Sequence, residues 1–352
     1  MAYGLQMFLN HWAFVLRENG YDRGSHTTRN MSSHGRSIQE NGMENQGFRE
    51  NVWSIVLAGG DGSRTKEFMR QWFNYDQYCA FDGTRSLFQY TLDRAARITP
   101  WERIAVVAAR HHQHEIWPQL DGRPAGMVLL QPKNVDTAAG SFLALAFILA
   151  RDPPATVVIH PSDSFIYPGG PFSSMVEQLV RGSVLLGGRP VLLAAKPGSL
   201  ELESGWIKPG RFLGWTGKAS VHAVERYLEN PVEAVAREAM ADGSLWNTRV
   251  LAAHGRELWS MGHECFPEFM SLFERLKAAI DTAAELRVLD EIYGLMPHRN
   301  FSSHLLQCAP ERLAVMEMTD VLWSDRGGPG RTLSHLEKIG EQPMFSHSWS
   351  DG

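Results

Sequence analysis

Short apolar runs alternate with helix-length amphipathic segments between Val52 and Ala195, and this alternation limits the fold more than any other feature. A short apolar run is typical of a buried strand, whereas apolar residues spaced three or four apart are typical of a helix. Strands that alternate with helices form a mostly parallel sheet that helices cover on both faces. The sequence therefore predicts an α/β fold, a doubly wound domain with a mixed central sheet.

The predicted elements follow one another in a regular order. Strands are expected at the apolar run that starts at Val52 and at residues 103–109, 126–132, 155–163, 189–195 and 313–323. Helices are expected at residues 86–98, 111–120, 137–152 and 171–182 and within residues 264–296. Because such sheets bind ligands at the carboxyl ends of their strands, one rim should carry the loops after Leu57, Leu130 and His160.

The chain divides by composition into three parts. Residues 1–50 form an N-terminal extension that is polar and aperiodic from residue 21 onward, so we expect it to be flexible. Residues 1–20 form either a short amphipathic helix or part of a mis-chosen translation start. Residues 51–331 carry the regular pattern and form the predicted domain, and residues 332–352 form a C-terminal tail.

Composition and charge argue against several kinds of partner. The net charge of −5 arises from 34 basic and 39 acidic residues without long blocks of either sign, so no nucleic-acid partner is expected. The longest apolar stretch, residues 138–150, is shorter than the ~20 residues that cross a bilayer, so no membrane partner is expected. Cys79, Cys265 and Cys308 lie far apart and form no C-x-x-C pair, which fits a cytoplasmic location.

A glycine-rich loop follows the first predicted strand. It reads Leu57-Ala58-Gly59-Gly60-Asp61-Gly62-Ser63-Arg64, and its glycines would let backbone N–H groups approach phosphate oxygens closely. No Gly-Lys-Ser/Thr follows, so the loop is not a Walker A motif, and Thr65 stands where a dinucleotide-binding loop has its last glycine. Two interpretations stay open: a phosphate-binding loop and an ordinary glycine-rich turn.

The loop and several further segments resemble those of one family. LAGGDGSR (57–64) resembles the L-A-G-G-x-G-S/T-R signature of sugar nucleotidylyltransferases. In the same order, further segments are similar to those of the mannose-1-phosphate guanylyltransferase type: DQYCAFDGTRSLFQYTLDRA (76–95), QPKNVDTA (131–138), HPSDSF (160–165), GWIKPG (205–210), LENP (228–231), GSLWNT (243–248) and WSDRGGPGR (323–331). The resemblance extends over about residues 52–331.

The resemblance implies a Rossmann-like nucleotidyltransferase domain of the GT-A-like type. It implies that the phosphate of a hexose 1-phosphate attacks the α-phosphorus of a nucleoside triphosphate, with release of pyrophosphate. GTP and mannose 1-phosphate are the expected substrates, and GDP-mannose is the expected product. Mg²⁺ is the expected cofactor, because the charge on the phosphate oxygens must be neutralised. The oligomeric state stays open, with a homodimer as one arrangement.

The resemblance also implies a role for each site residue. Asp163 and Asp325 match two carboxylates that hold Mg²⁺, and Arg64 matches an arginine that binds the leaving phosphates. Taken alone, an aspartate after a strand is more often a helix cap. Residues expected to hold the nucleotide are Leu57, Ala58, Gly59, Gly60, Gly62, Ser63, Gln131, Asn134 and Thr137. Residues expected to contact the sugar phosphate are Gly205, Glu229 and Asn247.

Four positions depart from the family pattern where phosphate should bind. Asp76 and Asn230 stand where the family has lysines, and Val135 and Asp136 replace an arginine and a glycine. Loss of one donor to a transition-state oxyanion costs about 3–4 kcal/mol, so two such losses could abolish turnover. The rival hypothesis is therefore a catalytically inactive binding or regulatory relative. Two nearby basic residues could substitute for the first lysine, Lys66 and Arg70.

Three histidines, His111, His112 and His114, lie close together in one predicted helix. Adjacent positions on a helix point in different directions, and no carboxylate or cysteine at a suitable spacing completes a metal site. We therefore expect these histidines to form a solvated polar face.

Deletion of residues 1–50 should leave the domain folded. Their composition offers little apolar surface to bury, and the first family segment begins only at Val52. We expect the truncated chain to unfold in one cooperative transition at the urea midpoint of the full-length chain. Circular dichroism during urea titration measures this midpoint, and a lower value would show that the extension takes part in the fold.

Overall fold

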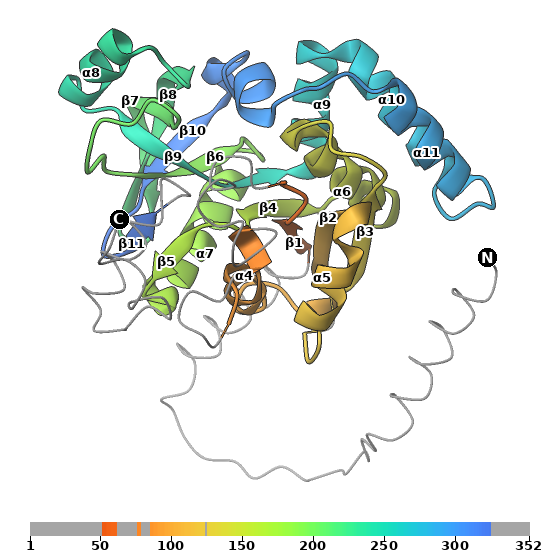
Figure 1. The fold of residues 1–352 in the computed structure, drawn as a ribbon. Coiled ribbons are helices and arrows are strands. Elements are labelled where there is room, and N and C mark those ends of the chain that lie inside the picture. Colours follow the sequence, from red (N-terminus) through yellow and green to blue (C-terminus); the bar gives the residue numbers. More distant parts are fainter. Residues whose placement is uncertain (1–50, 62–75, 79–84, 124, 325–352) are drawn as a thin grey trace, which may run out of the picture. The chain divides into compact units, whose positions relative to one another are not determined.

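A mixed sheet of nine strands forms the centre of the part of the chain that the computed structural model describes, residues 51–61, 76–78, 85–123 and 125–324 (Figure 1). The strand order is β3-β2-β1-β4-β9-β6-β10-β8-β7. A second, two-stranded sheet pairs β5 with β11. The strands are β1 Val52–Leu57, β2 Ile104–Ala109, β3 Met127–Gln131, β4 Thr156–Pro161, β5 Phe165–Tyr167, β6 Val191–Ala195, β7 Gly205–Thr216, β8 Ala219–Glu229, β9 Leu245–His254, β10 Ala314–Glu317 and β11 Leu322–Ser324.

Helices cover both faces of the large sheet. Ile55 of β1 packs into the core shared with α6, α9, α10 and α11, whereas the next residue, Val56, packs on the opposite face against α4 and α5. On that second face, α7 and α8 cover the strands beyond β4. The helices are α4 Leu87–Ala95, α5 Gln113–Gln119, α6 Thr137–Arg151, α7 Gly169–Leu185, α8 Glu233–Ala241, α9 Gly255–Cys265, α10 Pro267–Ala279 and α11 Glu285–Leu295. This three-layer arrangement confirms the predicted α/β fold class.

Shorter helical turns connect these elements. Five such turns are described: the 3₁₀ turns η1 Asp76–Tyr78, η2 Trp101–Arg103, η3 Arg110–His112 and η5 Pro310–Arg312, and the π-helical turn η4 Ser302–Leu306. The segment expected as one helix at residues 111–120 therefore begins as η3 and continues as α5.

The sheet is parallel from β3 to β4, and on the other side it is antiparallel except for the parallel pair β6 and β10. The four strands β3, β2, β1 and β4 run parallel, because helices carry the chain back between them. The long strand β9 then pairs antiparallel with both β4 and β6. Beyond β6, a hairpin of β7 and β8 turns at Gly217, whose φ of 58° suits glycine. The sheet is thus mixed, as predicted.

The strand expected at residues 313–323 is two strands in different sheets. β10 joins the large sheet beside β6 and β8, whereas β11 pairs with β5. The chain turns between them at Asp320, which has a φ of 57°. The apolar run predicts one strand, but the bend at Asp320 divides it into two.

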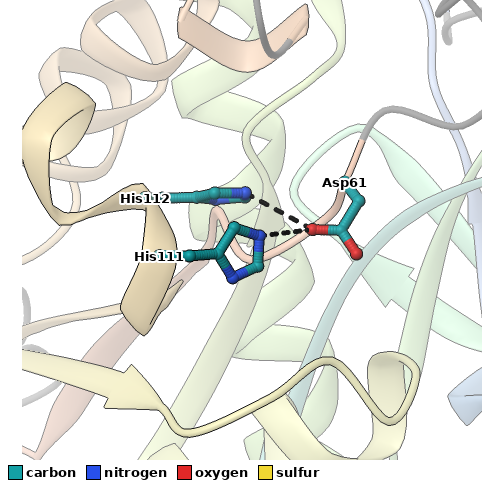
Figure 2. Close-up of side chains that lie close together, drawn as sticks. All are labelled: Asp61, His111 and His112. Carbon is teal, nitrogen blue, oxygen red and sulfur yellow. Dashed lines mark hydrogen bonds and ion pairs between the residues drawn. The ribbon is translucent and has the colours of Figure 1, made fainter.

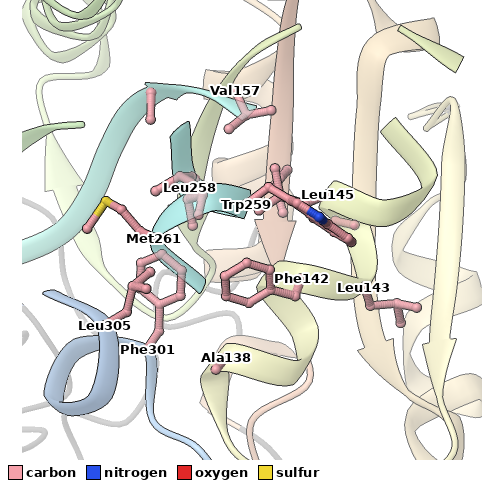
Figure 3. Close-up of a cluster of buried hydrophobic side chains, with 14 of the residues drawn as sticks. Ala138, Phe142, Leu143, Leu145, Val157, Leu258, Trp259, Met261, Phe301 and Leu305 are labelled. Carbon is pink, nitrogen blue, oxygen red and sulfur yellow. The ribbon is translucent and has the colours of Figure 1, made fainter. Parts of the chain in front are cut away.

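Helix α6 is apolar around almost its whole circumference because it is enclosed by the sheet and by other helices. Phe142 of α6 is fully buried and lies at the centre of an aromatic cluster (Figure 3). Its ring centroid is 5.5 Å from that of Phe266, 6.0 Å from Trp259 and 6.3 Å from Phe301. Within the described ranges, no helix is both long and apolar enough to cross a membrane.

Substitution Phe142→Ala should lower the free energy of unfolding by about 3–5 kcal/mol, because it leaves a cavity among several aromatic rings. The matched control is Phe212→Ala, since the Phe212 side chain is 45% exposed and should lose less than about 1 kcal/mol. Urea denaturation followed by tryptophan fluorescence measures both values. Equal effects of the two substitutions would contradict the central place of Phe142 in the core.

Candidate functional site

A cavity of about 570 Å³ opens at the carboxyl ends of β1, β3 and β4. Gly60, Gln131 and Pro161 contribute to its lining from the ends of these strands. The predicted common rim of the three loops is therefore confirmed. The volume falls within the ~300–1,000 Å³ that is typical of small-molecule sites.

The glycine loop is held at the cavity by backbone and side-chain hydrogen bonds. The Ala58 N–H donates to the Val107 carbonyl at 2.7 Å, which continues the β1–β2 pairing past the end of β1. The buried Gln77 amide donates to the carbonyls of Ala58 and Gly60, at 3.0 Å each. A Cβ at position 59 would lie 2.4 Å from the side-chain amide nitrogen of Gln131, so a larger residue there would displace that amide.

Three of the residues expected in this loop line the cavity, Leu57, Gly59 and Gly60. Ala58 is buried behind them and is not part of the lining. Three further expected residues, Gly62, Ser63 and Arg64, lie outside the described residues.

The residues expected to hold the nucleotide after β3 also line the cavity, and contacts within the fold orient them. The side-chain oxygen Oε1 of Gln131 accepts a hydrogen bond of 3.2 Å from the Tyr293 hydroxyl. The Asn134 amide donates to Oδ2 of Asp61 at 2.9 Å. The Thr137 hydroxyl accepts from the Phe301 N–H at 2.9 Å, which ties the start of α6 to the opposite wall.

The departures from the family pattern have clear structural consequences after Asn134. Val135 is fully buried in the core, so this position offers no group to the cavity. Asp136 lines the cavity and caps α6, since its carboxylate accepts from the Thr137 N–H at 2.6 Å. Its φ of 77° and ψ of 177° lie in a region that is essentially restricted to glycine.

The other two departures are Asn230 and Asp76. Asn230 is exposed, has a φ of 48° and is not part of the lining. Asp76 begins the turn η1, and its side chain lies outside the described part of the chain.

The residues expected to contact the sugar phosphate form one hydrogen-bonded cluster around Tyr227. The Tyr227 hydroxyl donates to the Glu229 carboxylate at 2.9 Å and accepts from the Asn247 amide at 2.7 Å. Burial, followed by the charge of Glu229, raises the pKa of Tyr227 well above its usual value. A Cβ on Gly205 would lie 2.5 Å from the Glu229 carboxylate and 2.7 Å from the Tyr227 hydroxyl, so a larger residue there would displace this pair.

Asp163 lies in the cavity wall shortly after β4, with its residue 6% exposed. A nearly buried carboxylate in a polar cavity is a fitting ligand for Mg²⁺, which prefers oxygen donors. Its expected partner, Asp325, lies outside the described residues. Among the described residues of the lining, Arg249 is the one arginine, and the acidic residues are Asp61, Asp136, Asp163 and Glu229.

Two of the three histidines converge on Asp61 of the glycine loop. Nε2 of His111 lies 2.9 Å and Nε2 of His112 lies 3.4 Å from the same oxygen, Oδ1 of Asp61. Figure 2 shows both rings with a nitrogen directed at that oxygen. The prediction of a solvated face is wrong for His112, which is fully buried, whereas His111 and His114 are exposed.

The surroundings of this cluster shift the pKa values of two of its groups. Burial lowers the pKa of His112, and the neighbouring His111 lowers it further. Burial raises the pKa of Asp61, but the hydrogen bonds from Asn134 and His111 outweigh it, so the net shift is downward. The neutral imidazole and the ionised carboxylate are therefore the favoured forms of His112 and Asp61 near neutral pH.

Several lining residues were not expected from the sequence. The segment from His298 to Leu306 follows α11 and forms one wall, yet it contains no motif that distinguishes it from a loop. Arg249 lines the cavity two residues after the expected Asn247, so alternation along β9 was the available signal, and Tyr227 lies behind the lining two residues before Glu229 on β8. Asp61 stood within the glycine loop, but its histidine partners are 50 residues away in sequence.

The fold and the cavity together define a class of protein. A mixed α/β sheet carries a glycine loop, a nearly buried carboxylate and a polar cluster at the carboxyl ends of its strands. In α/β proteins this edge of the sheet is the usual position of a small-molecule site.

Residues 53–339 match the family model described as Nucleotidyl transferase, and the chain therefore belongs to this family. The family acts on a nucleoside triphosphate and a sugar phosphate and generally uses a divalent metal ion.

Two solved structures illustrate the fold of the chain. It is similar to mannose-1-phosphate geranyltransferase from Thermus thermophilus, with 23% identity and a TM-score of 0.67 over 83% of this chain and 80% of that chain. It is also similar to mannose-6-phosphate isomerase from Helicobacter pylori, with 16% identity and a TM-score of 0.62 over 78% of this chain and 100% of that chain. Comparison with curated proteins gives no match. At these identities the likeness supports the fold alone.

Substitutions at Asp136 should separate its capping role from its backbone strain. Asp136→Ala loses the cap and the hydrogen bond of 3.1 Å from Asn300 but keeps the strained φ, so we expect a loss of about 1–2 kcal/mol of unfolding free energy. Asp136→Gly loses the same bonds but relieves strain of about 1–3 kcal/mol, so it should be more stable than the alanine variant. Urea denaturation measures both, and equal stability of the two variants would contradict the strain.

Proposed function

We propose that the chain is a sugar-1-phosphate nucleotidylyltransferase that converts GTP and mannose 1-phosphate into GDP-mannose and pyrophosphate. The observation that carries the proposal is the shared cavity, which brings the glycine loop, Asp163 and the Tyr227 cluster together. In the reaction, a phosphate oxygen of the sugar phosphate forms a bond to the α-phosphorus, and the bond from that phosphorus to the bridging oxygen of pyrophosphate breaks. No protein nucleophile is needed, so positioning and charge neutralisation are the tasks of the site.

The glycine loop and the residues after β3 suit the nucleotide in this proposal. Gly59 and Gly60 line the cavity and carry no Cβ, which lets phosphate oxygens approach their backbone closely. Gln131, Asn134 and Thr137 provide polar groups on the facing wall. Ala58, Gly62 and Ser63 complete the proposed loop, and Arg64 is proposed to bind the leaving phosphates.

The Tyr227 cluster suits the sugar. Glu229 and Asn247 line the cavity, and a carboxylate beside an amide can accept from and donate to sugar hydroxyls. Gly205 leaves the space that this arrangement needs.

Mg²⁺ bound by Asp163 and Asp325 is proposed as the cofactor. The described lining holds four carboxylates and one arginine, so a triphosphate would enter an acidic cavity. A divalent cation would neutralise charge on the phosphate oxygens and on the protein at the same time.

The same acidity favours a second candidate, a catalytically inactive relative that binds a ligand without turnover. Val135 is buried where the family pattern has a cationic side chain, and Asp136 adds a negative charge beside it. A binding protein tolerates these changes better than an enzyme does, because only an enzyme must stabilise the transition-state charge.

Turnover of defined substrate pairs tests the proposal. The full-length chain with Mg²⁺ should release pyrophosphate from GTP and mannose 1-phosphate faster than from other nucleoside triphosphate and hexose 1-phosphate pairs. Asp163→Asn should lower kcat at least about 100-fold, since it removes a charge from the metal site. The matched control is Asp121→Asn, because Asp121 is exposed and lies outside the cavity lining, and its kcat should not change.

Three outcomes decide between the candidates. Release from a different pair would keep the enzyme class and correct the substrates. Absence of release with every pair, together with calorimetric binding of a nucleotide, would favour the inactive relative. Equal loss of kcat in Asp163→Asn and Asp121→Asn would contradict the role of Asp163.

A further inference from the structure

We propose that Asp61, His111 and His112 form a binding site for a zinc-like divalent cation at the edge of the cavity. Its three ligands are different residues from those of the proposed Mg²⁺ site, Asp163 and Asp325. The proposed cation site goes beyond nucleotidyl transfer, because metal binding by these three residues can be measured without turnover.

The geometry carries the proposal. One ligand atom from each of the three residues lies within 4.8 Å of the other two. The two imidazole nitrogens lie 2.9 and 3.4 Å from Oδ1 of Asp61. In a tetrahedral zinc site with bonds of about 2.0–2.1 Å, neighbouring ligand atoms are separated by about 3.3 Å. The two distances lie on either side of this value, so small side-chain movements would admit the ion.

The position of the two rings favours a metal over an ordinary ion pair. A carboxylate that pairs with one histidine needs only one imidazole nitrogen, whereas here two adjacent residues direct nitrogens at one oxygen (Figure 2). The ring centroids of His111 and His112 lie 4.3 Å apart at an interplanar angle of 73°, so the two rings are close together without stacking face to face. A bound tetrahedral ion would lie among the three ligand atoms, with each of them directed at it.

The donor set selects the kind of ion. Two imidazole nitrogens and one carboxylate oxygen suit zinc and similar transition metals, whereas Mg²⁺ prefers oxygen ligands. Three protein ligands leave a fourth coordination position for water or another group. Asp61 also lines the cavity, so an anionic ligand bound there could supply that group. The ion would also offset part of the negative charge of the lining.

Surrounding contacts hold the three ligands in place. The Asn134 amide donates to Oδ2 of Asp61 at 2.9 Å, which leaves Oδ1 directed at the histidines. The His112 ring packs edge-on against Tyr78, with centroids 5.8 Å apart. The two segments that carry the ligands follow the paired strands β1 and β2, so the sheet fixes their separation. Such supporting contacts orient the ligands of metal sites in general.

Cobalt binding tests the site without any substrate. Metal-free full-length protein is titrated with Co²⁺, whose visible absorption is strong in tetrahedral sites, and Zn²⁺ then competes for the same site. We expect one Co²⁺ per chain with a tetrahedral spectrum that Zn²⁺ abolishes. His111→Ala and Asp61→Asn should weaken binding at least about 100-fold, because outer partners alone contribute about 10- to 100-fold. Asn134→Ala should weaken it about 10-fold.

The matched control is His114→Ala. His114 is exposed and lies three residues from His111 but outside the cluster, so its loss should leave Co²⁺ affinity unchanged. His111 is the preferred ligand to remove, because it is exposed and its substitution should not disturb the core, unlike that of buried His112. Thermal unfolding by circular dichroism verifies that each variant is folded.

Three results would overturn the proposal. The first is that the parent chain binds no Co²⁺ below about 100 µM. The second is that His111→Ala binds Co²⁺ as tightly as the parent chain does. The third is that His114→Ala weakens Co²⁺ binding as much as His111→Ala does. Because pyrophosphate release is measured separately, a failure of the metal site and a failure of the proposed reaction can be told apart.

Discussion

The pairing of β1 with β2 on one side and β4 on the other is the constraint on which the rest of the site depends. Leu57 is in register with Pro161, so β1 and β4 end at one level, whereas β2 continues two residues past Val107, the partner of Leu57, to Ala109. The bonding continues beyond the strands, since the Ala58 N–H donates to Val107 and the Ser162 N–H donates to Leu57. These backbone bonds bring the glycine loop, the turn η3 and Asp163 to one edge. Parallel pairing thus converts separate segments of sequence into one cavity.

The core and the cavity share a wall. Phe301 packs near Phe142 in the aromatic cluster and also lines the cavity, and its backbone N–H donates to Thr137 at the start of α6. Packing around α6 therefore supports the position of the wall that faces the glycine loop. A substitution that loosens the packing around Phe142 should therefore also shift the cavity wall at Phe301, because tightly packed interiors transmit displacement.

The described cavity lining is more acidic than the family pattern that the motifs of this chain resemble. Burial removes position 135 from the lining, and acidic side chains stand at positions 61, 136, 163 and 229. An anionic substrate would need positive charge from outside this set. Metal ions supply such charge compactly, which makes divalent cations central to both proposals for this protein.

The sequence alone determined the fold class and the common rim of three loops, because periodicity and strand ends are local properties. Its motifs also indicated part of the cavity lining, including Gly59, Asp163 and Glu229. It did not show that residues 313–323 divide between two sheets. The bend at Asp320 depends on the pairing of β10 with β6 and of β11 with β5, and both pairings are tertiary contacts. Nor did it show that His111 and His112 meet Asp61. Side chains 50 residues apart become neighbours only when β1 and β2 pair, and that contact was decided by tertiary structure.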